Sequence, residues 1–550
     1  MSKKSGKLKT GVLDFETDAF LAGRYPEPFA GCVYFGDDDY SVRWSEDNCA
    51  EQIAEIIRDL GPCSLYAHNG GKFDFHFLMP WAEPGEITVI NGRIAEYRIG
   101  ECILRDSFLL MPFGLAKYKK DKIDYSLFEP ETRYAHRDEI IQYLIADCRY
   151  TLELLNGFHS RLGKRLTVGS AAMAQIKKSG ADVVRQNKTH DETFRPFYYG
   201  GRVEAINPGI HTGPMVCIDL NSAYPDAMRS EHPTGHKRNY LCTRDLPDVL
   251  GPQFLKIRAV SNGALPFRED SGNLSFPDDR RDGIVREYRA TGWEVSAAIE
   301  YGLKRASVEV LECWTPSNTI NFKEFVDVHY KARKACKASG DLVGELVEKY
   351  VLNSGYGKFA ADPEKYYSWI LGVAGMAMDG DNPPYCEFPG IWLWRFPGDE
   401  LEKARSYYDV ATAASITGHV RATLFRALCI VTEPMCCDTD AIICRDPGDL
   451  ELSPDKLGAW KIEMRGNKLA VAGKKLYAFM APGSKEKIAS KGAILSAEEI
   501  FEIAAGGEIE YKQQAPTYSL ARGAFFTKRT IVSTNTRIER RKSKKNFFRI

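Results

Sequence analysis

Short apolar runs alternate with longer amphipathic stretches over the first third of the chain. Residues 11–17 (GVLDFET) and 64–68 (SLYAH) are apolar enough to predict two buried strands, and residues 96–108 alternate in the way of a β-hairpin. Residues 137–158 carry apolar side chains at helical spacing. Together these elements predict an α/β unit over residues 1 to about 160.

The remaining two thirds of the chain carry longer elements separated by irregular stretches. The apolar pattern predicts a strand over residues 214–220, a helical hairpin over 321–357, a helix over 411–428 and a pair of strands over 435–444. The two hairpin helices are separated by a break at residues 338–340. A polar connector is predicted over about residues 160–200, and residues 226–320 and 361–411, rich in Gly, Pro and charged or aromatic side chains, are predicted insertions, the second of them irregular.

Length and composition exclude several classes of protein. The chain has 550 residues, of which 44% are hydrophobic and 27% charged, so about three or four folded domains are expected rather than disorder. No run of 18 apolar residues occurs, and acidic residues follow the N-terminal lysines, so neither a membrane span nor a signal peptide is expected. The 14 cysteines form no CxxC pair, which predicts reduced thiols in a cytoplasmic protein.

A first group of acidic residues belongs to the predicted α/β unit. Asp14 and Glu16 are two apart on a strand and therefore point to one face, although a solvated strand end is the alternative for this pair taken alone. Asp74 follows the second strand, and Tyr143 and Asp147 share one face of the long helix. Four carboxylates on one unit predict a pair of Mg²⁺ ions about 4 Å apart, for attack of water on a phosphodiester, with the tyrosine hydroxyl orienting that water.

A second group of acidic residues lies in the later strands. Asp219 ends a buried apolar strand, a position that needs a cation nearby, and Asp438 and Asp440 flank a predicted hairpin turn. A simple Asx turn is the alternative for this Asp-Thr-Asp sequence. Tyr224 and the backbone that follows Asp219 predict a platform for a triphosphate and its sugar beside a metal ion.

The second helix of the predicted hairpin carries polar residues on one stripe. Lys349, Asn353 and Tyr356 are spaced to share a face, and the glycines on either side of Tyr356 leave room for another molecule. Lys337, at the hairpin tip, adds a second cation. Lysines neutralise phosphates while an aromatic ring stacks on a base, so this stripe predicts a nucleotide site.

Six motifs occur in order along the chain: DFET, HNGGKFD, YLIAD, DLNSAYP, KYVLNSGYG and CDTDA. They resemble the motifs of family B DNA polymerases, specifically the protein-primed branch found in tectiviruses, small podoviruses, adenoviruses and linear plasmids. The tectivirus enzymes are the most similar, partly because of the stretch YAHNGGKFDF. The resemblance covers nearly the whole chain.

The resemblance implies an α/β and α+β multidomain fold, with an RNase H-like 3′–5′ exonuclease domain followed by a right-hand polymerase. In the first half of the chain it implies an exonuclease domain (1–165), a linker with a YxGG motif (166–205), a first palm segment (206–237) and a first insertion (238–320). The rest would form the fingers (321–360), a second insertion (361–411), a second palm segment (412–482) and the thumb (483–550). The first insertion would dock a terminal protein and DNA. The second would support processivity and strand displacement, a surface loop without a role being the alternative.

Roles for individual residues follow from the same resemblance. Two metal ions of the exonuclease would be held by Asp14, Glu16, Asp74 and Asp147, with Tyr143 and Lys120 assisting. The single-stranded primer end would be held by Thr17, His68, Asn69, Phe73 and Ser107. For His68 and Phe73, a role in the protein core is the alternative.

The polymerase residues are carried over in the same way. Asp219 and Asp440 would hold the metals beside Asp438, and the incoming nucleotide would meet Tyr224 under its sugar, Tyr356 at the nascent base pair, and Lys337, Lys349 and Asn353. Contacts to DNA are implied for Tyr198, Gly200 and Gly201 in the YxGG motif, for Thr417 and Arg421 in a primer-binding helix, and for Lys475 and Tyr477 in a KxY motif. A chance match is the alternative for each of these three short motifs taken alone.

The chain departs from the family pattern at four places. HNGGKFD has an extra residue, Gly355 stands for a usual Leu, Cys436 for a Tyr and Ala441 for a Ser. None of these changes removes a metal ligand. They bear only on the fine geometry at the primer end and on the affinity for nucleotide.

The implied function is a proofreading DNA-directed DNA polymerase that replicates a linear viral or plasmid genome by protein priming and strand displacement. Two Mg²⁺ ions per site, replaceable by Mn²⁺, primer-template DNA, dNTPs, a terminal protein and a candidate single-stranded-DNA-binding protein are the implied partners, in the cytoplasm of a bacterial host. The alternatives are a stand-alone nuclease and a non-catalytic replication scaffold; Tyr224 as a sugar gate favours deoxynucleotides and leaves the type of template open.

The charge distribution agrees with a polyanion partner only locally. The formal net charge is zero, but residues 521–550 contain ten Lys or Arg and one acidic residue, Glu539. This end would grip duplex DNA as part of the thumb, a solvated tail being the alternative.

Overall fold

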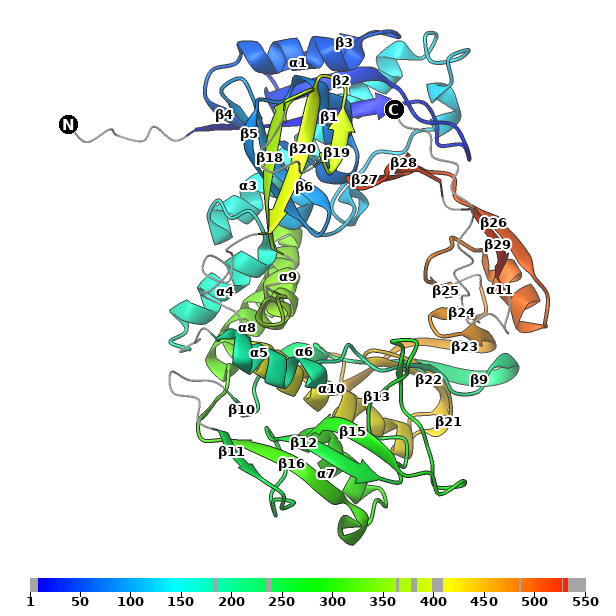
Figure 1. The fold of residues 1–550 in the computed structure, drawn as a ribbon. Coiled ribbons are helices and arrows are strands. Elements are labelled where there is room, and N and C mark those ends of the chain that lie inside the picture. Colours follow the sequence, from blue (N-terminus) through cyan, green and yellow to red (C-terminus); the bar gives the residue numbers. More distant parts are fainter. Residues whose placement is uncertain are drawn as a thin grey trace.

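The computed structural model describes residues 8–181, 186–233, 240–362, 366–376, 383–397, 409–483, 486–526 and 528–532. Its N-terminal α/β domain occupies one end of the molecule, a smaller domain occupies the other, and a second sheet with its helices lies between them (Figure 1). Among the described residues, no helix combines the length and apolar character that crossing a membrane requires. The basic tail over residues 533–550 lies outside the described residues.

The N-terminal domain is built on one sheet with helices on both faces. Its elements are β1 (Lys9–Thr17), β2 (Pro28–Gly36), β3 (Asp39–Trp44), α1 (Cys49–Asp59), β4 (Cys63–Ala67), α2 (Asp74–Leu78), β5 (Gly85–Ile90), β6 (Arg93–Ile99), β7 (Cys102–Asp106) and α3 (Arg137–Leu162). Along β1, Leu13 packs with the α1 side of the sheet, whereas Val12 packs with the α3 side. Because side chains alternate along a strand, Asp14 and Glu16 share the α3 face.

The sheet of this domain is extended by residues from far along the chain. Strands β18 (Tyr367–Val373), β19 (Cys386–Phe388) and β20 (Ile391–Pro397) continue it in the order β19-β20-β18-β5-β6-β7-β4-β1-β2-β3. The expectation of an irregular second insertion is therefore wrong for these strands. Trp369 and Leu371, two apart on β18, enter the core of the N-terminal domain, so the segment is ordered by pairing with β5.

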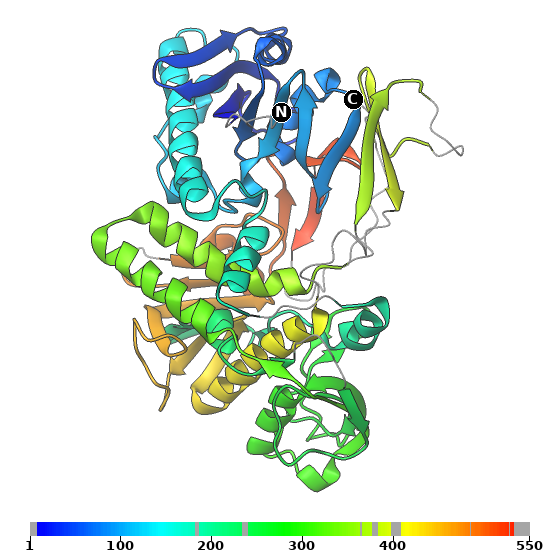
Figure 2. The same cartoon turned by 90° about the vertical axis from the view of Figure 1, so that its left-hand side faces the viewer.

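Two helices replace the predicted polar connector. They are α4 (Val168–Lys178) and α5 (Lys188–Phe194). The predicted helical hairpin is confirmed as α8 (Lys323–Ser339) and α9 (Leu342–Phe359), which lie between the two ends of the molecule (Figure 2). A Cβ added to Gly355 on α9 would lie 2.8 Å from Ile176 Cδ1 of α4, so this glycine serves helix packing and the expectation that it opens space for another molecule is wrong.

The second sheet carries the later acidic residues. It runs in the order β25-β24-β23-β9-β22-β21-β8. Its strands and the helices beside them are β8 (Val203–Ala205), β9 (Gly209–Leu220), α6 (Ala223–Ala227), α10 (Val410–Ile430), β21 (Thr432–Asp438), β22 (Ala441–Asp446), β23 (Trp460–Gly473), β24 (Leu476–Met480) and β25 (Glu486–Ser490). Buried residues of α10, β9 and β22 belong to one hydrophobic cluster, which fixes the helix beside the sheet.

The first insertion folds as a small domain of its own. It contains a sheet in the order β11-β16-β12-β15 with a helix, α7, and the short pairs β10–β17 and β13–β14. The bounds are β10 (His232–Pro233), β11 (Tyr240–Thr243), β12 (Phe254–Ala259), β13 (Phe267–Arg268), β14 (Leu274–Ser275), β15 (Arg286–Thr291), α7 (Gly292–Glu300), β16 (Glu309–Pro316) and β17 (Thr319–Ile320). This domain lies at the far side of α10 from the N-terminal domain (Figure 1).

The C-terminal segment returns from the second sheet to the N-terminal domain (Figure 1). Its elements are α11 (Ala497–Ala504), β26 (Ile509–Lys512), β27 (Thr517–Ser519), β28 (Gly523–Phe525) and β29 (Lys528–Val532). Tyr25 donates a hydrogen bond to the carbonyl oxygen of Ala524 at 3.2 Å, and Leu520 belongs to the core of the N-terminal domain. The β27–β28 hairpin is therefore anchored on that domain.

Candidate functional site

The first acidic group comes together on the α3 face of the N-terminal sheet. Asp14 and Glu16 of β1 meet Asp74 at the start of α2 and Asp147 of α3. Burial raises the pKa of Asp14 well above its usual range, and the negative charges of Asp74, Glu16 and Asp147 raise it further. Burial also raises the pKa of Asp74, to about 7. Such mutual repulsion is relieved when a cation binds between the carboxylates.

Two buried oxygens of this group are suited to a cation. Asp74 Oδ1 and Asp147 Oδ1 are buried and have no hydrogen-bond partner among the described residues. No three His, Cys, Asp or Glu side chains of the described chain form a ready ligand set for one ion. Mg²⁺ commonly takes one or two carboxylates and completes its shell with water and phosphate oxygens, so the residues fit an ion that shares its ligands with a substrate.

Lys120 and Tyr143 lie beside these carboxylates. Lys120 Nζ is 3.1 Å from Asp147 Oδ2 and 5.5 Å from the centre of the Tyr143 ring. The hydroxyls of Tyr143 and Tyr125 are 3.0 Å apart. No sequence pattern pointed to Tyr125, because it lies in a short 3-10 turn that has no periodicity.

The residues predicted to hold a primer end are divided between surface and core. The His68 ring nitrogens bond to Ser107 Oγ at 3.0 Å and to the carbonyl oxygen of Phe113 at 2.8 Å, which favours the core alternative for His68. Ser107 is fully buried and Thr17 is buried. Asn69, in a left-handed conformation, accepts a hydrogen bond from Arg93 at 2.9 Å.

Phe73 packs between two parts of the chain. Its ring lies edge-on to Phe77 at 5.1 Å, to Phe20 at 5.7 Å and to Tyr518 of the C-terminal hairpin at 5.5 Å. Phe73 is partly exposed and joins the N-terminal domain to the C-terminal hairpin, and its role at the primer end stays a prediction.

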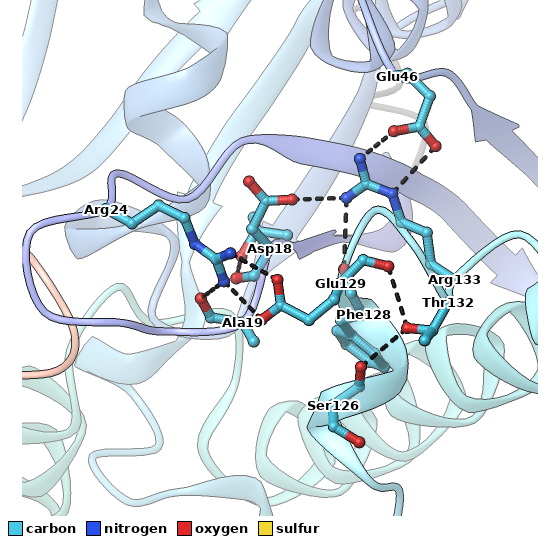
Figure 3. A network of polar contacts seen from close by, with 10 residues as sticks. Asp18, Ala19, Arg24, Glu46, Ser126, Phe128, Glu129, Thr132 and Arg133 are labelled. Carbon is cyan, nitrogen blue, oxygen red and sulfur yellow. Dashed lines mark hydrogen bonds and ion pairs between the residues drawn. The ribbon is translucent and has the colours of Figure 1, made fainter.

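A network of ion pairs holds the segment that follows β1 (Figure 3). Arg133 pairs with Asp18 at 2.6 Å and with Glu46, and Arg24 pairs with Glu129 at 2.6 Å. Arg133 and Glu129 lie just before α3. The network therefore fixes the end of the strand that carries Glu16 relative to the helix that carries Asp147.

The second acidic group lies at the ends of β9, β21 and β22. Asp219 pairs in register with Ala441, and the Leu220 N–H donates to the carbonyl oxygen of Asp440 at 2.8 Å, so Asp219 and Asp440 meet. Burial, followed by the charges of Asp219 and Asp438, raises the pKa of Asp440 to about 6. The predicted hairpin turn is confirmed, and this pair also fits an ion that is shared with phosphate oxygens.

The YxGG segment packs against this turn. A Cβ added to Gly201 would lie 2.7 Å from Thr439 Cγ2 and 3.1 Å from the Tyr224 hydroxyl, whereas one added to Gly200 would meet nothing within 4 Å. Gly201 is therefore required for close packing. Lys475 Nζ is 3.0 Å from Asp438 Oδ1, whereas Tyr477 is buried in the core beneath the sheet.

Two tyrosines and several cations face the second site. The rings of Tyr224 and Tyr356 stack with centres 4.2 Å apart and planes 2° apart. Burial lowers the pKa of Lys349, and the charges of Arg333 and Lys117 lower it further, so these cations lie close together. Arg333, which the sequence did not single out, is the α8 cation that acts most strongly on Lys349.

Of the other two predicted nucleotide ligands, Lys337 lies apart from that cation group and Asn353 lies one helical turn from Lys349. Lys337 is exposed in the last turn of α8, at the hairpin tip, about two helical turns from the level of Lys349. The exposed Asn353 donates a hydrogen bond to the carbonyl oxygen of Lys349 at 2.9 Å.

Comparison with known proteins decides the family. The profile of DNA polymerases type B, organellar and viral, matches residues 117–382. The DNA-directed DNA polymerase of Enterobacteria phage PRD1 is 36% identical over 569 aligned positions, which cover 97% of this chain and 99% of the phage protein. This chain belongs to the protein-primed family B DNA polymerases. The predicted family and the predicted DNA-directed DNA polymerase are both confirmed.

More distant relatives agree with this membership. The DNA polymerase of Bacillus phage phi29 is 24% identical over 78% of this chain and 80% of that protein. The solved structure of phi29 DNA polymerase with primer-template DNA and incoming nucleotide substrates has a TM-score of 0.68 at 18% identity, and the match covers 96% of this chain and 100% of that one. The mixed α/β multidomain fold expected for this polymerase is confirmed.

Two residues predicted to touch the primer lie in the core of the polymerase. Thr417 and Arg421 on α10 are 2% and 1% exposed. Arg421 Nε donates to Glu294 Oε1 at 2.7 Å, and Arg421 Nη1 donates to the carbonyl oxygens of Tyr199 and Gly200 at 2.8 and 3.0 Å. A direct contact of Arg421 with DNA is thus incompatible with its burial; it positions the YxGG segment instead.

We expect Arg421→Met to destabilise the polymerase by about 3–5 kcal/mol, because it leaves Glu294 buried and unpaired. Arg426→Met is the matched control: Arg426 lies on the same helix as Arg421, and the change removes a partly exposed pair with Glu300 of α7, at an expected cost below about 1 kcal/mol. Melting temperatures measure both. A double variant that adds Glu294→Gln should regain part of the loss; equal melting temperatures for Arg421→Met and Arg426→Met would contradict the importance of the buried pair.

Proposed function

We propose that this DNA polymerase proofreads its own product, with synthesis and 3′–5′ degradation at separate sites. The observation that supports the proposal is the presence of two separate carboxylate groups. Asp14 and Glu16 of β1 lie with Asp74 of α2 and Asp147 of α3 at the N-terminal sheet, whereas Asp219 of β9 and Asp440 of the β21–β22 turn lie at the second sheet. A stand-alone nuclease would have no use for the second group, and a non-catalytic scaffold would not need either.

At the synthesis site, Asp219 and Asp440 hold the metals and Asp438 lies beside them. Bound Mg²⁺ would lower the pKa of the primer hydroxyl and stabilise the leaving pyrophosphate. Tyr224 lies under the sugar and excludes a 2′-hydroxyl, and Tyr356 faces the nascent base pair. Lys349 neutralises the phosphates, so the residues of the chain chiefly position and neutralise the reactants.

At the degradation site, the four carboxylates hold the metals and Tyr143 orients the attacking water. Lys120 is close enough to Asp147 to neutralise charge as the phosphodiester is cleaved. Asn69 and Thr17 border the entry of the primer end, and Gly200 leaves open space in the segment that connects the two sites.

Initiation is proposed to use a hydroxyl of a separate terminal protein, which receives the first nucleotide. The first insertion would dock this protein, and the β18–β20 hairpin would support processivity and strand displacement on a linear viral genome in the cytoplasm of a bacterial host. The membership in the protein-primed branch and the separate domain formed by the first insertion support this proposal.

Protein priming is tested by incubating the polymerase with labelled dNTP, Mg²⁺ or Mn²⁺ and the terminal protein candidate encoded nearby. We expect label to become covalently attached to the added protein and to survive denaturing electrophoresis and nuclease treatment. Asp440→Ala in the same assay is the negative control. Label found only in nucleic acid extended from added primers would contradict protein priming.

A further inference from the structure

Strand register places a lysine directly opposite a proposed metal ligand of the synthesis site. Lys461 of β23 pairs with Asp219 of β9, on the side of β9 away from β22. Residues that face each other across antiparallel strands point to the same face, with Cβ atoms about 5 Å apart. Lys461 Nζ lies 2.8 Å from Asp219 Oδ1, so the two side chains form an ion pair on the face of the acidic group.

This ion pair uses an oxygen that a metal ion needs. Mg²⁺ binds carboxylate oxygens at about 2.0–2.1 Å, so an ammonium group on the same oxygen and a bound ion compete for it. The Lys461 side chain is 38% exposed and therefore has room to turn away. A partly exposed salt bridge contributes at most about 1 kcal/mol to stability, which makes a purely structural role a weak reason for the pair.

Lys461 also lies near the cations of the helical hairpin. Burial, the charges of Arg333 and Lys117, and then that of Lys461 lower the pKa of Lys349 on α9. Lys461 thus contacts Asp219 of the second sheet and lies within electrostatic reach of Lys349 on α9. A lysine stem with four carbons can move its ammonium group from one side of this space to the other.

We propose that Lys461 binds the triphosphate of the incoming nucleotide, and that it neutralises Asp219 until metal and nucleotide arrive. This inference rests on the proposed assignment of Asp219 and Asp440 to the metals of the synthesis site. The ammonium group would hold the place of a cation beside the acidic pair and would leave the carboxylate for a phosphate oxygen when the metal binds. No covalent step is involved.

The test is Lys461→Met in a parent that carries Asp14→Ala and Glu16→Ala, so that metal binding at the other site does not interfere. Lys468→Met, an exposed lysine on the same strand, is the matched control. Two dissociation constants are measured: that of Mn²⁺ without nucleotide, and that of the correct dNTP with Ca²⁺ and a dideoxy-terminated primer-template. We expect the dNTP constant to rise about tenfold, as loss of a charged hydrogen bond predicts, and the Mn²⁺ constant to fall severalfold.

The opposite signs separate this proposal from a structural role, which would weaken both bindings. An unchanged dNTP constant overturns the proposal, and so does a Mn²⁺ constant that rises or stays the same. Lys461→Arg should keep the dNTP constant within about threefold of the parent, because the charge is retained. If Mn²⁺ binding persists in a variant with Asp219→Asn and Asp440→Asn, the proposed metal site itself is wrong; failure of Lys461→Met alone affects only the present inference.

Discussion

Asp219→Ala and Asp440→Ala are each expected to lower nucleotide incorporation by about 10³-fold or more and to leave 3′–5′ degradation of a single-stranded primer unchanged. Each removes one of the two carboxylates that meet at the ends of β9 and β22, and the charge stabilisation lost with a catalytic metal amounts to several kcal/mol. The degradation site is unaffected because its carboxylates lie in the N-terminal domain, on β1, α2 and α3. Primer extension and primer degradation, measured on the same labelled oligonucleotide, give both rates.

Asp449→Ala is the matched control for these variants, because Asp449 is exposed in the loop that follows the same hairpin. It should keep both activities within about twofold, as surface substitutions away from a site usually do. If incorporation and degradation disappeared together in a folded Asp219→Ala variant, the assignment of the two acidic groups to separate activities would be wrong.

The combination of Asp14→Ala with Glu16→Ala is expected to give the reverse result. Degradation of a single-stranded primer should fall by about 10³-fold or more, because both carboxylates of β1 are lost, while incorporation on a primed template stays intact. Mismatched primer ends should then persist and be extended. The measurement is release of label from a 3′-mismatched primer in the presence and absence of dNTPs.

The melting temperature of the same double variant tests whether it is correctly folded. In the folded protein the pKa of Asp14 is raised by burial and by neighbouring carboxylates, so its ionisation destabilises the fold as pH rises through the raised pKa. The variant should therefore melt no lower than the wild type at pH 8 without metal. Asp38→Ala, an exposed change in the turn between β2 and β3, is the control. A variant that melts much lower would show that loss of degradation reflects misfolding.

The sequence by itself determined the local geometry of both sites. Side-chain alternation along a strand placed Asp14 and Glu16 on one face, and helical spacing placed Tyr143 and Asp147 on another. Neighbouring residues have these relations whatever the rest of the chain does, because backbone geometry fixes them. The same holds for the turn between Asp438 and Asp440, which needed only local pairing of β21 with β22.

Only the tertiary structure decided which distant segments meet. The pairing of β18 with β5, the contact of Phe73 with Tyr518 and the register that sets Lys461 against Asp219 join residues that no short-range pattern relates. The tertiary structure also determined which charged side chains are buried. Arg421 was expected at the primer, but it lies in the core, where it pairs with the buried Glu294. Such contacts form because the whole fold buries apolar surface and pairs its buried charges. The order of apolar and polar residues along the chain does not show which distant residues are buried together.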